Sequence, residues 1–369
     1  MGIEPAHEQA EPLCMLTPAG ERTGPPAVHI GDETQSLRDF YRDMTLIRRI
    51  DTEAFALQRH GELGLWAPLR GQEAAQIGAG CALASQDWVF PSYREHGIAW
   101  TRGIGPELLL GMFRGTEMSG WDPNEFRYAY GQIIIGAQTL HAVGYALGLQ
   151  LDGLVGNDDP QRDTAVLTTF GDGATSQGAV AEAMMWAASY QAPVVFFCQN
   201  NHYAISVPVE RQSRSPLAHR ARGFGFEGIR IDGNDVLACY EAVASALAKA
   251  RAGGGPTLIE AVTYRRGPHT TSDDPSRYRE SAEEEYWESR DPIERVRLRL
   301  VELGVPGEFF TEIDAEANDL GARVREACLA LPEPDLGALF DQVFTEQDPH
   351  LAAQQAEYRS WHGVSGGAA

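Results

Sequence analysis

Two short apolar runs, each ended by small or polar residues, constrain the fold of this chain more than any other feature. The run TAVLTTF (164–170) is followed by Gly-Asp-Gly at 171–173, and VVFFC (194–198) is followed shortly by Asn-Asn at 200–201. A continuous run of apolar and β-branched residues is typical of a strand that is buried on both faces. Residues 176–190 between the two runs are predicted to form a helix, so the segment indicates a parallel, right-handed βαβ unit.

A further strand is expected at TLIEAVTY (257–264), after a helix over about 235–252 and the turn-forming run GGGP. Strands that alternate with helices along a chain indicate an α/β fold with helices on both faces of a parallel sheet. We therefore predict an α/β protein with a doubly wound parallel sheet and helical additions.

Composition divides the chain into three predicted regions. Residues 1–34 carry five prolines and no periodic apolar pattern, so they are predicted to form a flexible N-terminal arm. A long amphipathic helix is expected to begin at Ser36, where apolar residues start to recur at helical spacing. We assign residues 35–290 to the α/β domain and residues 291–369 to a C-terminal helical region.

The charge of the chain bears on its partners and its location. Lys and Arg number 30 against 52 Asp and Glu, which gives a formal net charge of −22. A surface this negative repels nucleic-acid phosphates and anionic lipids, so neither nucleic acid nor membrane is an expected partner. The chain shows no apolar run of membrane-spanning length and no signal-peptide pattern. The five cysteines are odd in number and dispersed, which argues against a disulfide framework and a zinc site, and we expect a soluble, cytoplasmic protein.

The polar residues that end the two strands predict the chemistry. Both groups leave the carboxyl edge of a parallel sheet, where α/β proteins bind ligands, and a glycine turn before a helix suits a diphosphate. Asp172 and Asn201 add the hard oxygen ligands that Mg²⁺ prefers. No Lys-Ser/Thr follows the glycines and position 176 is Ser, which excludes a Walker A loop and a GxGxxG motif. A lone Gly-Asp-Gly would most often be a simple turn, but the two groups at this spacing favour a metal-bridged diphosphate.

The segments GDGATSQG (171–178) and VVFFCQNNHYAIS (194–206) resemble the thiamine-diphosphate motif. From about residue 36 to about residue 300 the chain resembles the alpha subunits of the decarboxylating component of 2-oxo acid dehydrogenase complexes, with bacterial branched-chain and pyruvate dehydrogenase chains the most similar. The resemblance implies the thiamine-diphosphate-binding fold, with thiamine diphosphate and Mg²⁺ as cofactors. Four further segments carry the likeness: LRGQEAA (69–75), FPSYRE (90–95), GQIIIGAQ (131–138) and YRRGPHTTSDDPSRYR (264–279).

The same resemblance implies roles for individual residues near the diphosphate. Asp172 and Asn201 match the Mg²⁺ ligands of the family, with the backbone carbonyl of Tyr203 as a third protein oxygen. Gly173 and Ala174 match the backbone that meets the diphosphate.

Further positions match residues around the rest of the cofactor. Tyr93 and Arg94 match a pair that hydrogen-bonds the phosphates, a task that suits a planar guanidinium. Ile133 and Ile135 lie where the main chain contacts the aminopyrimidine ring, and we expect their side chains to fill the core. His269 matches the loop histidine that contacts the diphosphate and assists acyl transfer to a lipoyl group.

The residues around His269 also bear on its role without the family. It follows Gly-Pro in a polar loop, where a histidine near a diphosphate and two carboxylates would titrate near neutrality and act as a general acid. The alternative is a solvated loop histidine with no role.

The chain departs from the family pattern at three places. Residues 126–130 (FRYAY) lack a second histidine that many relatives carry, and Gln199 stands where some relatives have Arg. Thr270 stands where animal branched-chain relatives have a regulatory serine, and we expect no such control here.

Thiamine catalysis requires a glutamate beside the aminopyrimidine, which the family places on a second, pyrimidine-binding domain. Only one diphosphate-type module is evident in this sequence, so the resemblance implies a separate beta subunit in a heterotetramer of two alpha and two beta chains. The expected reaction is oxidative decarboxylation of a 2-oxo acid and acyl transfer to the lipoyl group of an acyltransferase component. We favour a branched-chain acid such as 3-methyl-2-oxobutanoate, with pyruvate as the alternative. A single-chain thiamine enzyme and a non-catalytic nucleotide-binding module are the other classes.

Overall fold

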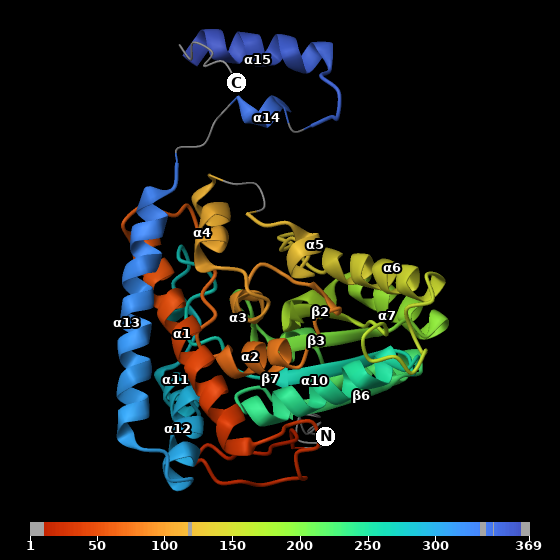
Figure 1. Ribbon diagram of the computed structural model, residues 1–369, viewed down its shortest axis with the longest axis vertical. Helices are drawn as coiled ribbons and strands as arrows, with labels where there is room; N and C mark the ends of the chain where they lie inside the picture. The colour runs from red at the N-terminus through yellow and green to blue at the C-terminus, as the bar shows by residue number, and fades with distance from the viewer. Residues whose placement is uncertain (1–10, 117–119, 333–336, 342, 363–369) are drawn as a thin grey trace, which may run out of the picture.

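The computed structural model describes residues 11–116, 120–332, 337–341 and 343–362 of the chain. Its centre is a five-stranded sheet in the order β1-β2-β3-β7-β6, with every neighbouring pair parallel (Figure 1). The α/β fold with a parallel sheet is therefore confirmed. The strands are β1 (Trp88–Phe90), β2 (Val166–Gly171), β3 (Val194–Asn200), β6 (Glu227–Asp232) and β7 (Thr257–Val262).

The register of β2 and β3 places the two predicted polar groups side by side. The two strands pair in parallel from Val166 opposite Val194 to Gly171 opposite Gln199. The chain that follows β2 therefore leaves the sheet next to the chain that follows β3. This alignment is what brings Asp172 and Asn201 to one edge.

Helices cover both faces of the sheet, as a doubly wound architecture requires. On one face α6 (Ala137–Leu151) and α7 (Gly178–Tyr190) pack with the inward side chains of β2 and β3 in one apolar cluster. On the other face α2 (Glu73–Cys81) and α10 (Val236–Arg251) share a second cluster with α1 (Glu33–Arg59). The strands β2, β3 and β7 therefore bury both of their faces, which explains their continuous apolar runs.

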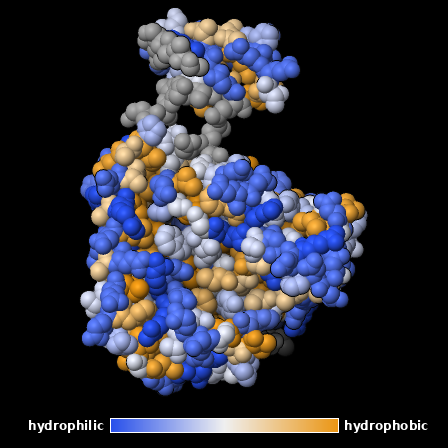
Figure 2. All heavy atoms as spheres, viewed as in Figure 1, coloured by the Kyte–Doolittle hydropathy of each residue, from blue (hydrophilic) through white to orange (hydrophobic). Residues whose placement is uncertain are grey.

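A helical layer flanks the α/β core. Helix α13 (Gly307–Ala330) runs along α1, and α12 (Pro292–Glu302) packs beside both α1 and α2. The final hairpin of α14 (Ala338–Asp341) and α15 (Pro349–His362) stands apart from the rest of the chain at the top of Figure 1. Hydrophilic side chains dominate much of the face seen in Figure 2.

Short elements complete the structure around the sheet. They are α3 (His96–Thr101), α4 (Pro106–Arg114), α5 (Pro123–Phe126), α8 (Val209–Gln212), α9 (Arg220–Phe224) and α11 (Ser281–Glu288), the hairpin of β4 (Tyr203–Ala204) with β5 (Val207–Pro208), and the 3₁₀ turns η2 (Asp172–Ser176), η3 (Leu217–His219) and η4 (Pro275–Arg277).

The described part of the N-terminal region differs from the predicted flexible arm. Met15 and Leu16 are buried in the core, and their backbone N–H groups donate to the Asp235 carboxylate at 2.6 Å each. Helix α1 begins at Glu33 rather than Ser36, because the Asp32 side chain accepts from a backbone N–H of the first turn. Backbone hydrogen bonds to a distant carboxylate leave no periodic signal in the sequence. The proline content of this segment therefore did not reveal that its described part is ordered.

Irregular segments pair with both outer strands of the sheet. Leu13 forms a parallel bridge with Ile231 of β6, and Tyr128 forms one with Val89 of β1. Each bridge is supported by backbone hydrogen bonds of 2.9–3.0 Å. Both outer strands therefore have a backbone partner on their outward side.

The structure also bears on the cysteines and on the expected lack of a membrane-spanning segment. All five cysteines are free thiols, as predicted. Within the described ranges, no helix combines the length and apolar character that crossing a membrane requires.

Candidate active site

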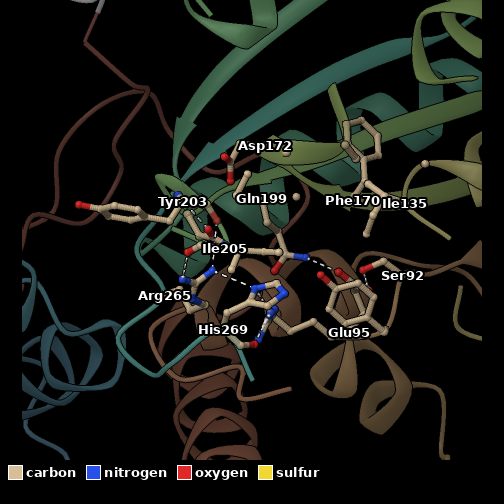
Figure 3. A pocket seen from close by; sticks show the side chains of 18 of the residues that line it. Ser92, Glu95, Ile135, Phe170, Asp172, Gln199, Tyr203, Ile205, Arg265 and His269 are labelled. Carbon is tan, nitrogen blue, oxygen red and sulfur yellow. Dashed lines mark hydrogen bonds between the residues drawn. The ribbon is translucent and has the colours of Figure 1, made fainter. Parts of the chain in front are cut away.

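A cavity of about 250 Å³ opens at the carboxyl ends of β2 and β3. Its wall combines an apolar part, including Phe170 and Ile135, with polar groups from both sides (Figure 3). Asp172 reaches in from the sheet, whereas His269 lies on the opposite side beside Arg265. Among the predicted residues, the lining includes Tyr93, Arg94, Ile135, Asp172, Gly173, Ala174, Asn201, Tyr203 and His269.

The turn η2 carries Asp172, Gly173 and Ala174 directly from the end of β2. A Cβ atom at Gly173 would lie 2.8 Å from the Cβ of Ala204 in β4, so this close approach requires glycine. The Asp172 carboxylate is 1% exposed, and burial raises its pKa to about 6. Gln212 Nε2 donates to Asp172 Oδ2 at 2.8 Å.

The loop after β3 carries the other predicted oxygen donors. Asn201 Nδ2 donates to Gln72 Oε1 at 2.9 Å, and its Oδ1 accepts from the backbone N–H of Tyr203 at 3.3 Å. The carbonyl of Tyr203 accepts from Arg265 Nη1 at 3.1 Å. These contacts leave each oxygen a second lone pair.

The donor set fits a hard divalent cation. Asp172, Asn201 and the Tyr203 carbonyl offer one carboxylate and two neutral oxygens, the ligand types that Mg²⁺ takes together with phosphate and water. No Lys or Arg in the described part of the chain forms an ion pair with Asp172. A buried carboxylate without a paired cation is costly, and a bound cation would offset that cost.

The loop after β3 is held in an uncommon backbone conformation. His202 and Ile205 have positive φ angles of 71° and 57°, and for a β-branched residue such as Ile205 this is a strained state. Arg265 Nη2 donates to the Ile205 carbonyl at 2.8 Å, while its Nη1 holds Tyr203. One buried guanidinium therefore fixes the loop on both sides of Ala204.

Two guanidinium groups face the same ring nitrogen of His269. Arg94 Nη2 lies 3.3 Å and Arg265 Nη1 lies 3.2 Å from His269 Nδ1. Burial, Arg94 and Arg265 lower the pKa of His269 to about 3. The expectation of titration near neutrality is therefore wrong for this state, because guanidinium groups face the ring where we expected two carboxylates. Arg groups can only donate, so Nδ1 accepts and the proton sits on Nε2.

The loop around His269 is ordered by its own hydrogen bonds. The backbone N–H of His269 donates to Asp273 Oδ2 at 2.7 Å, and the same carboxylate oxygen accepts from the Tyr278 hydroxyl. The Tyr93 ring packs edge-on against the imidazole with centroids 6.1 Å apart. The side chain is thus held in the cavity wall, which disfavours the reading of a solvated loop histidine.

Arg94 is committed mainly to protein carbonyls. It is 5% exposed, and its Nη1 and Nη2 donate to the carbonyls of Pro68 at 2.6 Å and His269 at 2.8 Å. It therefore ties the loop of His269 to the segment before α2. Its role toward a phosphate remains a prediction.

The expected burial of Ile133 and Ile135 is wrong. Ile133 is 75% exposed, Ile134 is 74% exposed and Ile135 is 41% exposed, and only Ile135 of the three lines the cavity. This segment precedes α6 and forms an apolar surface beside the cavity rather than part of the core.

The similarity of the chain to known proteins identifies its family. The sequence matches the family described as "Dehydrogenase E1 component" over residues 41–330. The chain belongs to this dehydrogenase E1 family. It is similar to the 3-methyl-2-oxobutanoate dehydrogenase subunit alpha of Mycobacterium tuberculosis, with 45% identity over 353 residues, covering 95% of this chain and 94% of the relative.

Pyruvate dehydrogenases are similar to this E1 chain as well. The pyruvate dehydrogenase E1 component subunit alpha of Acholeplasma laidlawii is 38% identical over 336 residues, covering 89% of this chain and 94% of the relative. The corresponding subunit of Bacillus cereus is 36% identical over 355 residues, covering 95% of this chain and 93% of the relative. The E1 family depends on thiamine diphosphate and its members are oxidoreductases, which confirms the predicted enzyme class.

The three departures from the family pattern have structural counterparts in this E1 chain. Where the second histidine is missing, the buried Tyr128 donates its hydroxyl proton to the Glu95 carbonyl at 2.9 Å, and Tyr128 does not line the cavity. Gln199 donates to Glu95 Oε1 at 2.8 Å, while Ser92 donates to Glu95 Oε2 at 2.8 Å. Thr270 Oγ1 lies 3.3 Å from the Ser272 hydroxyl on the exposed part of the loop.

Three residues of the E1 site were missed as individual candidates. Gln72, Gln212 and Arg265 contact Asn201, Asp172 and His269, respectively. Gln72 and Arg265 lie inside segments that carry the resemblance, but nothing in their sequence pattern indicates their partners. Gln212 lies in none of those segments.

Proposed function

We propose that this chain is the alpha subunit of a 2-oxo acid dehydrogenase that decarboxylates a branched-chain 2-oxo acid and transfers the acyl group to a lipoyl group of an acyltransferase. The observation that carries the proposal is the buried carboxylate of Asp172 beside Asn201, above the glycine turn at the carboxyl edge of the sheet. The five free thiols suit a reducing compartment, so the proposal places the protein in the cytoplasm.

The proposal assigns the cofactor to the residues around β2 and β3. Asp172, Asn201 and the Tyr203 carbonyl would hold Mg²⁺, and the backbone of Gly173 and Ala174 would meet the diphosphate. Bound thiamine diphosphate supplies the electron sink for loss of carbon dioxide. The protein orients the reacting groups and excludes water.

His269 is the proposed hydrogen-bond donor that assists acyl transfer. Because Arg94 and Arg265 occupy the Nδ1 side, the imidazole holds its proton at Nε2 while remaining neutral. The two guanidinium groups thereby fix the tautomer and the ring orientation. Because the imidazole stays neutral, its Nε2–H group remains available as a hydrogen-bond donor over a wide pH range.

A beta subunit is the proposed source of the remaining wall. The described part of this chain holds one parallel sheet and a two-stranded hairpin, which leaves the pyrimidine-side glutamate to a second chain. Ile133 and Ile134 are exposed next to the cavity, and exposed apolar groups of this kind are typical of interfaces. We propose a heterotetramer of two alpha and two beta chains in which this surface is covered.

The preference for a branched-chain acid is supported by the 45% identical relative, whose name specifies 3-methyl-2-oxobutanoate. Pyruvate is the second candidate, supported by relatives of 36–38% identity. The cavity alone does not separate them, because the proposed beta chain would complete it.

The test is to co-express the chain with a candidate beta chain and to measure kcat/KM for 3-methyl-2-oxobutanoate and pyruvate. A higher value for the branched acid is expected, and a higher value for pyruvate would reverse the preference. Calorimetry with thiamine diphosphate and Mg²⁺ tests the site itself. Failure of the two-chain complex to bind them would reject the proposal in favour of a nucleotide-binding module, whereas full activity of the single chain would indicate a single-chain thiamine enzyme.

A further inference from the structure

Each side chain that we assign to the metal ion is held by a glutamine from a distant part of the chain. We propose that Gln72 and Gln212 are positioning residues that present Asn201 and Asp172 to the cation and set its selectivity for Mg²⁺. This inference rests on the proposed function. It concerns two glutamines that do not themselves supply a predicted metal ligand.

Gln212 acts on the carboxylate. It ends the short helix α8, and its Nε2 donates to Asp172 Oδ2 at 2.8 Å. Because this bond occupies one lone pair of Oδ2, it favours binding of a cation through Oδ1 alone over binding through both oxygens. Gln212 Oε1 also accepts from the Ser176 hydroxyl at 3.4 Å, which fixes the orientation of the amide so that its N–H group faces Asp172.

Gln72 accepts a hydrogen bond from the amide of Asn201, whereas Gln212 donates one to Asp172. It occupies the N-cap position of α2 yet makes no capping bond with its side chain, and it is 1% exposed. Its Oε1 accepts from Asn201 Nδ2 at 2.9 Å. The amide of Asn201 is therefore oriented with Oδ1 turned away from Gln72, and Oδ1 also accepts from the Tyr203 backbone.

The different chemistry of the two contacts separates positioning from general packing. At position 72 an acceptor is required, so Gln72→Glu keeps the contact to Asn201 and Gln72→Met removes it. At position 212 a donor is required, so Gln212→Met frees the Asp172 carboxylate to rotate. Ca²⁺ accepts carboxylates through two oxygens and flexible geometry, whereas Mg²⁺ demands a near-ideal octahedron. Loss of the Gln212 contact should therefore harm Mg²⁺ binding more than Ca²⁺ binding.

The experiment uses the complex of this chain with its beta chain and titrates Mg²⁺ or Ca²⁺ calorimetrically at a fixed, saturating concentration of thiamine diphosphate. Loss of a partner that orients a metal ligand typically weakens metal affinity by about 10–100-fold. We expect Gln212→Met and Gln72→Met to raise the Kd for Mg²⁺ by that factor. Gln72→Glu is expected to bind Mg²⁺ about tenfold more tightly than Gln72→Met, and Gln212→Met to lower the ratio of Mg²⁺ to Ca²⁺ affinity.

Gln86→Met is the matched control, because Gln86 Nε2 also donates two hydrogen bonds, to the carbonyls of Pro160 and Asp163, but before the amino end of β1 and away from the proposed metal site. Its Kd for Mg²⁺ should equal that of the wild type. The inference would be overturned if both Met variants bound Mg²⁺ as tightly as the wild type does. It would also be overturned if the variants lost equal affinity for Mg²⁺ and Ca²⁺ and Gln72→Glu and Gln72→Met had the same Kd for Mg²⁺. If the wild-type complex shows no metal-dependent binding, the proposed function itself fails.

Discussion

Arg94 Nη2 and His269 Nδ1 lie 3.3 Å apart, and the same guanidinium nitrogen donates to the His269 carbonyl at 2.8 Å. One arginine thus fixes both the ring and the backbone of the loop histidine. Because a guanidinium has no acceptor, protonation of Nδ1 would bring two positive charges together. Burial, together with the charges of Arg94 and Arg265, lowers the pKa of His269 to about 3, far below that of an ordinary histidine.

The first prediction concerns the pH dependence of His269 reactivity. With a pKa of about 3 the imidazole is already neutral at pH 5, so its acylation by diethyl pyrocarbonate should change less than about twofold between pH 5 and pH 8. N-acetylhistidine, with an ordinary pKa near 6.5, should slow more than about tenfold toward pH 5 over the same range. Site-resolved mass spectrometry measures both rates, and a profile for His269 that follows the free compound would disprove the neutral assignment.

The second prediction separates the two half-reactions. His269→Ala removes the proposed hydrogen-bond donor at Nε2, and loss of a positioned acid–base side chain typically costs about 10²–10⁴-fold in rate. We expect a loss of that size in lipoyl acylation but less than about tenfold in decarboxylation, assayed with an artificial electron acceptor. Equal losses in the two assays would contradict the role in acyl transfer.

The third prediction compares Gly173 of η2 with Gly178 at the start of α7. Gly173→Ala would place a Cβ atom 2.8 Å from the Ala204 side chain, whereas a Cβ atom at Gly178 meets nothing within 4 Å. Gly173→Ala should weaken thiamine diphosphate binding more than about tenfold because η2 must move away from β4. Gly178→Ala, at the first residue of α7, should leave the Kd unchanged. Calorimetry on the two-chain complex decides, and similar affinities for both variants would refute the packing argument.

The fourth prediction tests the surface beside the cavity. Ile133→Asp introduces a charge at a position that we assign to the beta interface, and it should weaken assembly by at least about tenfold. Val28→Asp is the control, since Val28 is 79% exposed on the N-terminal segment. Sedimentation velocity measures the assembly of both variants. Wild-type assembly of the Ile133 variant would remove this surface from the interface.

The fifth prediction links a buried carboxyl group to stability. Burial raises the pKa of Asp51 to about 6, although Oδ1 accepts from Trp66 Nε1 at 2.8 Å and from the Leu69 N–H at 2.9 Å. Since the folded pKa lies above the unfolded value near 3.9, this group's contribution to stability is lost as pH rises through 6.

Asp51→Asn keeps an acceptor oxygen at the same place and cannot ionise. Its free energy of unfolding, relative to the wild type, should therefore rise by about 2 kcal/mol between pH 4 and pH 7 and stay level above pH 7. Urea unfolding across this range provides the measurement. A constant difference between the two proteins would show that Asp51 does not titrate as described.

The convergence of Asp172 and Asn201 was predictable because it depends on local patterns. Two buried strands, one helix and the parallel rule place the ends of β2 and β3 together. By contrast, β1 has only three residues and β6 is a partly exposed outer strand, so neither produces a strong apolar run. Hydrophobic periodicity detects strands by their burial and therefore misses short or marginal ones.

The partners of the site residues could not be predicted in the same way. Gln72 lies 129 positions from Asn201, and Gln212 lies 40 positions from Asp172. Side-chain hydrogen bonds over such separations follow from tertiary packing, which has no period in the sequence. Ile133 was wrongly predicted to lie in the core, because an exposed apolar residue cannot be told from a core residue by its sequence.

The bridges of Leu13 and Tyr128 on the two outer strands have a consequence for handling the chain before assembly. An open strand edge offers unpaired backbone groups on which other chains can build an intermolecular sheet. Here both margins already carry a backbone partner from the same chain. Self-association of an unassembled alpha chain should therefore proceed through its apolar side-chain surfaces, which mild detergent reverses, rather than through amyloid-like strand addition. Truncation up to Leu13 would remove the backbone partner of Ile231 and leave that part of the β6 edge open to strand addition.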